Sequence, residues 1–315
     1  MITGASGFVG KNACTFLNDI GFEVNAHSRS FCNLPSNIKL LKSKSLDTIF
    51  SDNKEIKNIE CVIHLAGKAQ DINKSDRKIY NSYFKNNTEE TLKFALECAN
   101  ASVKRFIFMS SIKVNGESTF KESFNENDAP KPKGPYALSK YQSEIGLLKI
   151  GERTNMEIVI LRPPLIYGKG VRGYFRTILN LIKLKIPLPL GSFIDNKRSF
   201  IYIENLLNLL SVLIKHPKAA NEIFLCSDDD YISTSDLLEK LSVGMHNKNI
   251  IFKFPKFIFL ILSFLGRRSL FKKLNQSLSI NNSKVASLLE WKAPISMDKA
   301  LKKVAREFLI DKKLS

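Results

Sequence analysis

Tyr136 and Lys140 are one helical turn apart and could move a proton together. The Tyr-x-x-x-Lys spacing places both side chains on one face of a predicted helix. A lysine charge beside a phenol lowers the phenol pKa from about 10 towards neutrality, so Tyr136 could act as an acid or a base on a carbonyl or carbinol. Ser111 follows a predicted strand and could bond to the same oxygen. We therefore predict that Ser111, Tyr136 and Lys140 are catalytic.

A glycine-rich turn near the start of the chain could hold a dinucleotide. The three glycines of TGASGFVG have G-x-x-G-x-x-G spacing and open a predicted helix. Such glycines permit a tight turn, let the backbone approach a pyrophosphate, and let the helix pack closely on its strand. The predicted cofactor site at this turn comprises Gly4, Ser6, Gly7, Phe8, Val9 and Gly10. Lys140 could then hold the nicotinamide ribose.

Only Met1, Ile2 and Thr3 precede Gly4, although the strand there should be the central strand of the sheet. Two expectations follow: either the start lies too far downstream, or the strand is truncated and the cofactor site is weakened. No basic start with an apolar core precedes the glycine turn, so we expect no signal peptide.

The end of the second predicted strand, AHSRS, bears on the choice of cofactor. In an NAD site this place commonly holds an Asp or Glu that bonds to the adenosine ribose. Here it holds Ser28, followed by Arg29. A hydroxyl and a guanidinium suit a 2′-phosphate, so we favour NADP over NAD. The alternative is that Arg29 is a solvated loop residue.

Strands and helices alternate in the first half of the chain. Apolar runs in FEVNAHS, CVIHLAG, RFIFMSS and MEIVILRP predict buried strands, and KNACTFLNDIG, TEETLKFALECANA and YALSKYQSEIGLLKIGER predict helices. This alternation predicts an α/β fold with a doubly wound parallel Rossmann sheet.

The second half of the chain breaks this pattern. IPLPLGS predicts a loop, and ISTSDLLEKL predicts a helix capped by Ser233 or Thr234. We predict a Rossmann cofactor-binding domain in residues 1–167 and about 198–226. A smaller C-terminal α/β substrate lobe would comprise about 168–197 and 227–315.

Composition narrows the classes of partner. The net charge is +18, but the lysines are dispersed, which argues against nucleic-acid binding. A lysine-rich coding bias and a phosphate-bearing ligand explain the charge best, with weak association to an anionic membrane surface as an alternative.

The apolar run at 257–265 is too short to cross a bilayer and predicts a buried amphipathic helix. Five scattered cysteines fit a reducing, cytoplasmic compartment and no metal site.

The chain resembles an extended short-chain dehydrogenase/reductase of the nucleotide-sugar epimerase/dehydratase group over nearly its whole length. The matching segments are TGASGFVG at 3–10, HLAG at 64–67, NNTEETL with Asn87, SSIKV at 110–114, YALSK at 136–140, LRPPLIYGKG at 161–170 and RSFIYIENL at 198–206. The last two are specific to the extended, sugar-nucleotide type. Within HLAG, His64 is expected to end a buried strand rather than to act in catalysis.

The resemblance also implies roles for single residues. Leu65, Ala66 and Gly67 would line the cofactor, Asn87 would position the catalytic region, and Pro163 would lie near the nicotinamide. The implied substrate site takes a UDP-sugar: Arg198 would bind its diphosphate, Leu188 would lie against the uridine in the loop at 187–191, and Arg172, Lys113 and Asn115 would complete it. Arg172 could instead reach only water. The resemblance implies an adenine-binding Asp where this chain has Ser45.

This sequence differs from the dehydratases and from many 4-epimerases of the group at two places, and both bear on its activity. Nucleotide-sugar 4,6-dehydratases carry an Asp-Glu pair after the catalytic hydroxyl residue, where this chain has Ile112 and Lys113. We therefore reject dehydration and expect hydride transfer at C4. Many 4-epimerases have Tyr where this chain has Asn115, and the run SSIKVNGE resembles the branch that reduces UDP-4-keto-6-deoxy-N-acetylhexosamine to UDP-N-acetylquinovosamine.

We predict such a reductase acting in O-antigen or other surface polysaccharide synthesis, with a UDP-hexose 4-epimerase as the alternative. A non-catalytic NAD(P)-binding sensor is the remote alternative, since such proteins usually lose the Tyr or the Lys. Extended members often dimerise through paired helices, and the helix that contains Tyr136 could supply one, so we expect a homodimer.

Overall fold

The computed structural model describes residues 1–30, 32–41, 43, 45–52, 58–68, 77–247, 251–255 and 274–311. Its strands are β1 (Ile2–Thr3), β2 (Asn25–His27), β3 (Lys39–Leu41), β4 (Cys61–His64), β5 (Arg105–Met109), β6 (Glu157–Arg162), β7 (Leu165–Tyr167), β8 (Arg198–Tyr202), β9 (Ile223–Leu225) and β10 (Tyr231–Ile232). Its α-helices are α1 (Phe8–Asp19), α2 (Ile49–Asp52), α3 (Arg77–Tyr83), α4 (Glu90–Asn100), α5 (Gly134–Arg153), α6 (Tyr174–Lys183), α7 (Ile203–Lys215), α8 (Thr234–Gly244), α11 (Ser283–Leu289) and α12 (Met297–Asp311). Short helical turns are η1 (Leu46–Thr48), η2 (Phe84–Glu89), η3 (Ile112–Val114) and η4 (Pro217–Ala219).

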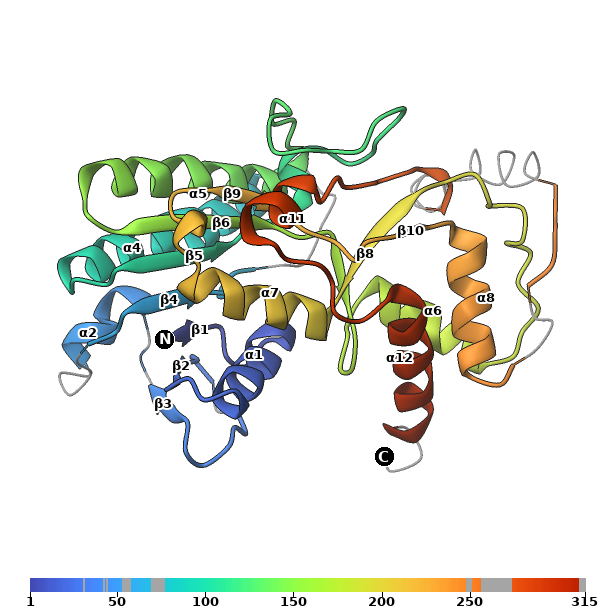
Figure 1. Cartoon of the computed structure of the whole chain (residues 1–315), viewed down its shortest axis with the longest axis horizontal. Helices are drawn as coiled ribbons and strands as arrows, with labels where there is room; N and C mark the ends of the chain where they lie inside the picture. Colours follow the sequence, from blue (N-terminus) through green and yellow to red (C-terminus); the bar gives the residue numbers. More distant parts are fainter. Residues whose placement is uncertain are drawn as a thin grey trace.

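A seven-stranded parallel sheet forms the larger part of the molecule (Figure 1). Its order is β3-β2-β1-β4-β5-β6-β9, so the direction of winding reverses between β1 and β4. Ligands of such sheets bind at this reversal, outside the carboxyl ends of the strands. β1 is as short as the sequence suggests, yet it pairs in register with both β2 and β4. The predicted α/β class and doubly wound parallel sheet are confirmed.

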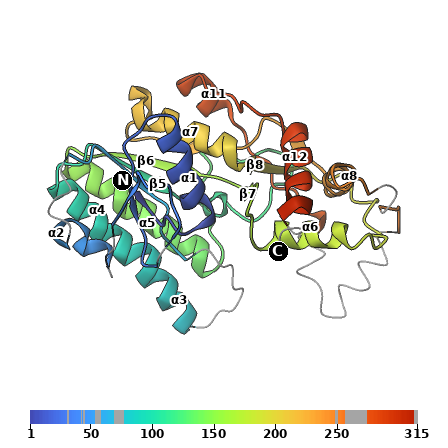
Figure 2. The ribbon, with the colours of Figure 1, turned by 90° about the horizontal axis from the view of Figure 1, so that it is seen from below.

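Helices cover both faces of this sheet because successive strand residues point to opposite sides. On β5, Phe106 and Phe108 pack with α4 and α5, whereas Ile107 and Met109 pack on the side of α1 and α7. Figures 1 and 2 show these two helical layers on either side of the strands. All five residues of β5 are buried, which explains the continuous apolar run in the sequence.

A second, three-stranded sheet has the order β10-β8-β7, with α6, α8 and α12 beside it (Figure 1). The Ser233 hydroxyl caps α8 by accepting from the Asp236 amide, as predicted. We propose that 1–167 and about 198–226 form the cofactor domain, and that the remainder forms the substrate lobe. This division keeps α7 and β9 with the large sheet, although β8 pairs in the small one. The helix predicted at 257–265 lies outside the described residues.

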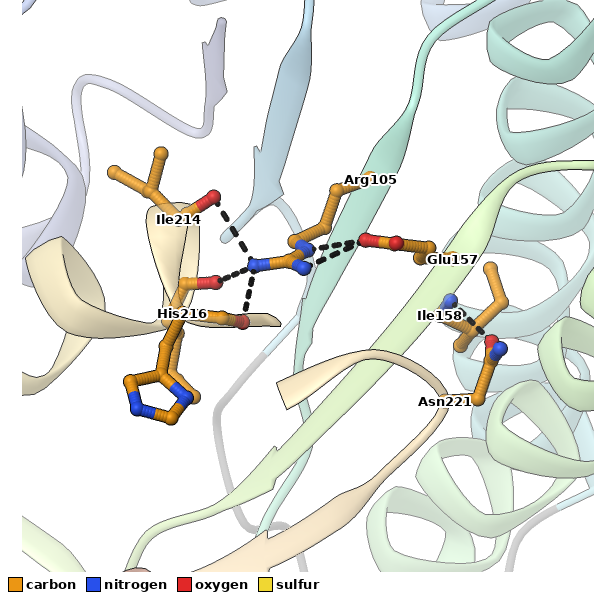
Figure 3. A network of polar contacts seen from close by, with 7 residues as sticks. Arg105, Glu157, Ile158, Ile214, His216 and Asn221 are labelled. Carbon is orange, nitrogen blue, oxygen red and sulfur yellow. Dashed lines mark hydrogen bonds and ion pairs between the residues drawn. The ribbon is translucent and has the colours of Figure 1, made fainter. Parts of the chain in front are cut away.

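The amino ends of β5 and β6 are tied to the end of α7 by Arg105 (Figure 3). Its guanidinium donates to the carbonyl oxygens of Leu213, Ile214 and His216 and pairs with Glu157 at 2.7 Å. The last carbonyls of a helix lack partners within the helix, so a buried cation there satisfies them.

We predict that Arg105→Met lowers the free energy of unfolding by about 2–3 kcal/mol, because three carbonyls and a carboxylate lose their donor. The adjacent Lys104 is a matched control, since its pair with Glu60 is exposed. Lys104→Met should cost less than about 0.5 kcal/mol. Urea unfolding measures both variants, and equal losses would contradict the role given to Arg105.

Asp228 joins the two sheets from the loop after β9. It accepts from the Tyr202 amide, from the Asn205 side chain and from the Tyr167 hydroxyl, at 2.7 to 3.1 Å. Burial raises the pKa of this carboxyl to about 6, against the lowering effect of those three hydrogen bonds. An unfolded Asp titrates near 3.9, so the folded state holds this proton to higher pH.

This shift predicts a pH-dependent difference between wild type and Asp228→Asn. The unfolded carboxyl ionises first, so wild-type stability falls relative to the variant as pH rises from about 4 to about 6. The fall should amount to at most about 3 kcal/mol. Urea unfolding across that range measures it, with exposed Asp230→Asn as the control. A difference that does not change with pH would contradict the prediction.

Candidate active site and dinucleotide pocket

The glycine turn between β1 and α1 is closely packed against the end of β4. Gly4 has a φ of +72°, and a Cβ there would lie 2.8 Å from the Ala66 amide nitrogen. A Cβ on Gly10 would lie 2.1 Å from the Gly4 carbonyl oxygen. Both positions therefore require glycine. The turn aims the amino end of α1, a favourable place for a phosphate, at the carboxyl end of the sheet.

A pocket opens beside this turn. It is lined by Gly4, Ser6, Gly7, His27, Ser28, Arg29, Ser30, Leu46, Leu65, Ala66, Gly67, Lys68, Asn86 and Glu90. The structure thus brings together most of the predicted cofactor residues, while Phe8, Val9 and Gly10 lie in the first turn of α1 behind them. A glycine cradle that any Cβ would fill, next to a pocket lined by buried polar groups, fits a dinucleotide.

The polar end of β2 lies in this pocket. Ser28 is 3% exposed and its hydroxyl accepts from the Ser30 amide, whereas the Arg29 side chain is exposed. Glu90, the first residue of α4, also lines the pocket. Ser45 precedes η1, and its carbonyl accepts from the Ser43 hydroxyl.

Asn87 clamps the backbone after β4. Its side-chain oxygen accepts from the Lys68 amide at 2.7 Å, and its amide group donates to the Lys68 carbonyl and to the Ser139 hydroxyl. Asn87 lies in η2, a π-helical turn before α4 that the sequence did not predict. Such turns are rare and occur often at functional sites. Through these bonds Asn87 links the pocket to α5.

Lys140 lies between the pocket and the end of β5. Its ammonium donates to the Met109 carbonyl at 2.9 Å and lies 4.5 Å from the centre of the Phe108 ring. A Cβ built on Gly67 would be 3.4 Å from its nitrogen. Burial lowers the pKa of Lys140 to about 8, and nearby Glu144 opposes that shift. Tyr136, one turn earlier on α5, is half-buried and packs edge-on against Tyr83.

Ser111 lies two residues after β5 and is the N-cap of η3. Its hydroxyl accepts from the Lys113 amide at 3.3 Å, and the next amide, of Ile112, donates to the Pro163 carbonyl. Ser111 and Pro163 therefore share one edge of the sheet with Lys140. The Ile112 side chain is 3% exposed and packs with Leu225 and Ile280, so it belongs to the core.

A buried ion pair that sequence reasoning missed holds this edge together. The Arg162 guanidinium makes two bonds to the Glu144 carboxylate, at 2.6 and 3.0 Å, and both side chains are at most 3% exposed. The Ser110 hydroxyl donates to the same carboxylate. Arg162 also donates to the side-chain oxygen of Asn115, so Asn115, predicted to touch substrate, is buried in this network. The sequence signal was available: Glu144 follows Lys140 by four residues, on the same helix face.

His64 ends β4 as predicted. One ring nitrogen bonds to the Thr3 hydroxyl at 2.9 Å and the other to the Thr91 hydroxyl at 3.0 Å. Burial, with a smaller effect of Lys140, lowers the pKa of His64 to about 3, so the ring is neutral at pH 7. His64 serves the core rather than the chemistry.

The remaining residues predicted to bind substrate lie outside the dinucleotide pocket. Arg198 begins β8, where it donates to the Gln276 carbonyl and lies over the Phe200 ring. Leu188 forms an isolated bridge with Ile251, and Arg172 is exposed before α6. Lys113 is half-buried in η3.

The described residues include no cluster of three His, Cys, Asp or Glu side chains able to hold a metal ion. Over the same ranges, no helix is long and apolar enough to cross a membrane.

Comparisons with known proteins agree with this geometry. A model of the NAD dependent epimerase/dehydratase family matches residues 1–226. UDP-glucose 4-epimerase of Vibrio cholerae is 32% identical over 98% of this chain and 95% of its own length. dTDP-4-dehydro-6-deoxyglucose reductase of Escherichia coli is 27% identical over 80% of this chain and 83% of its own. The chain belongs to the NAD dependent epimerase/dehydratase family and is an NAD(P)-dependent nucleotide-sugar enzyme.

A solved structure shares the whole fold. UDP-glucuronic acid 4-epimerase from Bacillus cereus, crystallised in complex with NAD, superimposes with a TM-score of 0.76 over 98% of each chain. Its sequence identity is 19%, so this likeness concerns the fold alone.

The buried pair predicts a large effect of Glu144→Gln. The variant leaves the Arg162 charge without a counter-ion, which should cost about 3–5 kcal/mol of unfolding free energy. Glu152→Gln, an exposed position on the same helix, is the matched control and should cost under about 0.5 kcal/mol. Urea unfolding distinguishes them, and a Glu144→Gln loss below 1 kcal/mol, on the order of one neutral hydrogen bond, would refute the assignment.

Proposed function

We propose that this enzyme transfers hydride at C4 of a UDP-sugar, and that it reduces UDP-4-keto-6-deoxy-N-acetylhexosamine for surface polysaccharide synthesis. The observation that carries the proposal is the pair of residues after Ser111. Ile112 is a buried apolar residue and Lys113 is a cation, so these two places hold no carboxyl group for the elimination of water. Hydride transfer needs only the groups that the site retains.

The proposed chemistry uses three side chains. When bound, NAD(P)H supplies the hydride that reaches C4. The Tyr136 hydroxyl gives its proton to the C4 oxygen, so that a ketone becomes a secondary alcohol, and a proton from solvent restores the tyrosine. The Ser111 hydroxyl bonds to the same oxygen and holds it in place. Lys140, with a pKa of about 8, carries its positive charge at pH 7 and favours the phenolate that remains.

We propose NADP as the preferred cofactor. Ser28 and Arg29 follow β2, the Arg29 side chain is exposed, and the run AHSRS contains no Asp or Glu. A 2′-phosphate placed there would gain charge-assisted hydrogen bonds. A reductase consumes one reduced cofactor in each turnover, which suits this choice.

We place the nucleotide half of the substrate against the second sheet. The half-buried Arg198 side chain, which donates to the Gln276 carbonyl, provides a cation for a diphosphate, and Leu188 provides an apolar surface for the uracil ring. Arg172 and Lys113 are further cations of the proposed substrate site.

A UDP-hexose 4-epimerase is the second candidate, and one observation favours it. The Vibrio cholerae relative with that name matches almost the full length of this chain at 32% identity. An epimerase would use the same three side chains, with Tyr136 first accepting the C4 hydroxyl proton and later returning it. It would leave the cofactor unchanged overall.

The test incubates purified protein with UDP-4-keto-6-deoxy-GlcNAc and NADPH and follows the nicotinamide absorbance. We expect stoichiometric loss of NADPH. UDP-GlcNAc and UDP-glucose, each with the oxidised cofactor, test the epimerase in parallel. Formation of a C4 epimer without net cofactor change would refute the reductase proposal and support the epimerase. No reaction in any of the assays would overturn both proposals.

Tyr136→Phe should lower kcat of the active reaction by about 100- to 10,000-fold, because the proton donor is lost. Tyr141→Phe removes a hydroxyl from the same helix and should change kcat less than about twofold. Binding of ADP, measured by calorimetry, should be unchanged in both variants. Full activity of Tyr136→Phe would exclude this tyrosine as the acid.

A further inference from the structure

The end of the molecule that lies away from the large sheet is built from three short segments (Figures 1 and 2). We call this end the distal tip, and it comprises residues 181–194, 243–247 and 251–255. The Asn247 side chain donates to the Ile182 carbonyl at 2.9 Å, and the Phe252 amide donates to the Leu188 carbonyl at 3.1 Å. The end of α6, the end of α8 and the chain after α8 are therefore neighbours.

The distal tip exposes large apolar side chains. Half of the large apolar side chains that are exposed within the described residues belong to it: Leu181, Leu184, Ile186, Ile194, Val243 and Phe252. Their exposed fractions lie between 39% and 63%. Single exposed apolar residues are ordinary on a protein surface, but a group of them at one place indicates a surface that binds a partner.

The distal tip also carries positive charge and no negative charge. Lys183, Lys185 and Lys253 lie among its apolar residues, and its three segments contain no Asp or Glu. In the order Leu184, Lys185, Ile186, a cation stands between two exposed apolar side chains. This pattern suits the headgroup region of a membrane, where apolar side chains reach the acyl boundary and long lysine side chains extend to anionic phosphates.

A membrane explains this composition better than a protein partner does. Two copies that met through the distal tip would bring their lysines together with no carboxylate from these segments to oppose them. Protein interfaces are enriched in Tyr, Trp and Arg and depleted in Lys, and the three segments contain no Tyr, Trp or Arg. Leu, Ile and Val with lysines between them are typical of surfaces that lie in a lipid interface.

The backbone at Lys185 adds a second observation. This residue follows α6 with a φ of +55°, and its amide donates to the Ile182 carbonyl at 3.1 Å. Gly or Asn would end the helix in this conformation with less strain than a lysine does. The lysine is therefore not required by the helix end, and its exposed side chain adds a cation to the distal tip.

We propose that the distal tip binds the surface of a membrane that contains anionic lipids. Leu184, Ile186 and Phe252 enter the boundary between headgroups and acyl chains, and Lys185 and Lys253 pair with lipid phosphates. The net charge of the sequence allowed weak association of this kind without placing it on the molecule. Binding of lipid does not depend on the proposed reaction, because the dinucleotide pocket and the proposed catalytic residues lie outside the distal tip.

The first experiment sediments purified enzyme with vesicles of equal parts phosphatidylglycerol and phosphatidylcholine. We expect wild type to bind them, and to bind pure phosphatidylcholine at least about tenfold more weakly. Leu184→Ser with Ile186→Ser should weaken binding about tenfold. Lys185→Asn with Lys253→Gln should weaken it roughly 30-fold, or about fivefold for each lysine. Asn tolerates the φ of position 185.

Each pair of substitutions has a matched control elsewhere on the surface. Ile20→Ser with Leu96→Ser removes two exposed apolar side chains at the ends of helices beside the large sheet. Lys104→Gln with Lys218→Gln removes two exposed cations, one before β5 and one in η4. Both control pairs should bind the vesicles within about threefold of wild type, because charges beyond a Debye length of the lipid are screened.

Insertion into the lipid has a readout of its own. The chain contains one tryptophan, Trp291, which is 5% exposed. Ile186→Trp adds a fluorophore at the distal tip, and its emission should be quenched by vesicles whose acyl chains carry bromine. Leu96→Trp is the control and should not be quenched.

Three results would overturn the proposal. Equal losses of vesicle binding in the distal-tip pairs and in the control pairs would mean that net charge alone adsorbs the protein. Loss with the lysine pair only, and no quenching in Ile186→Trp, would mean that no apolar side chain enters the lipid. No vesicle binding by wild type would also overturn it, and a lower melting temperature or a smaller oligomer of Leu184→Ser with Ile186→Ser would then show that protein covers the distal tip. NADPH oxidation is measured without lipid, so none of these results bears on the proposed function.

Discussion

The buried ion pair between Glu144 and Arg162 is the interaction on which the proposed site depends. Two charges inside a protein are tolerated only when they are paired and their remaining hydrogen-bonding capacity is used. Here one carboxylate takes bonds from Arg162 and from Ser110, next to Ser111. α5, β6 and the turn after β5 are therefore fixed relative to one another, and the positions of Tyr136 and Lys140 follow from that.

An Arg–Glu pair also joins the amino ends of β5 and β6. β5 and β6 are adjacent and in register. Arg105 and Glu157 pair at their amino ends, where the guanidinium also holds the end of α7. Arg162 and Glu144 pair at their carboxyl ends. Two Arg–Glu pairs, one buried and one partly exposed at Glu157, thus hold the centre of the sheet against helices on both faces.

The sequence allowed the architecture to be predicted, because its determinants are local. Continuous apolar runs marked β4, β5 and β6, and glycine spacing marked the phosphate turn. The features that the sequence did not reveal are non-local. The π-helical turn around Asn87 follows from bonds to Lys68 and Ser139, which are distant in sequence. β8 pairs with β7 and β10, and no pattern within β8 specifies those partners. The depth at which Asn115 is buried depends on Arg162, 47 residues away.

The pocket and the proposed catalytic residues are built from different segments of the chain. Every residue that lines it comes from the first 90 of the chain, whereas Ser111, Tyr136, Lys140 and the pair beneath them come from the next segment. A change within the first segment can alter which dinucleotide is held without touching the groups that move the proton. The proposed choice of cofactor and the proposed proton transfer are therefore encoded in separate, successive segments of the chain.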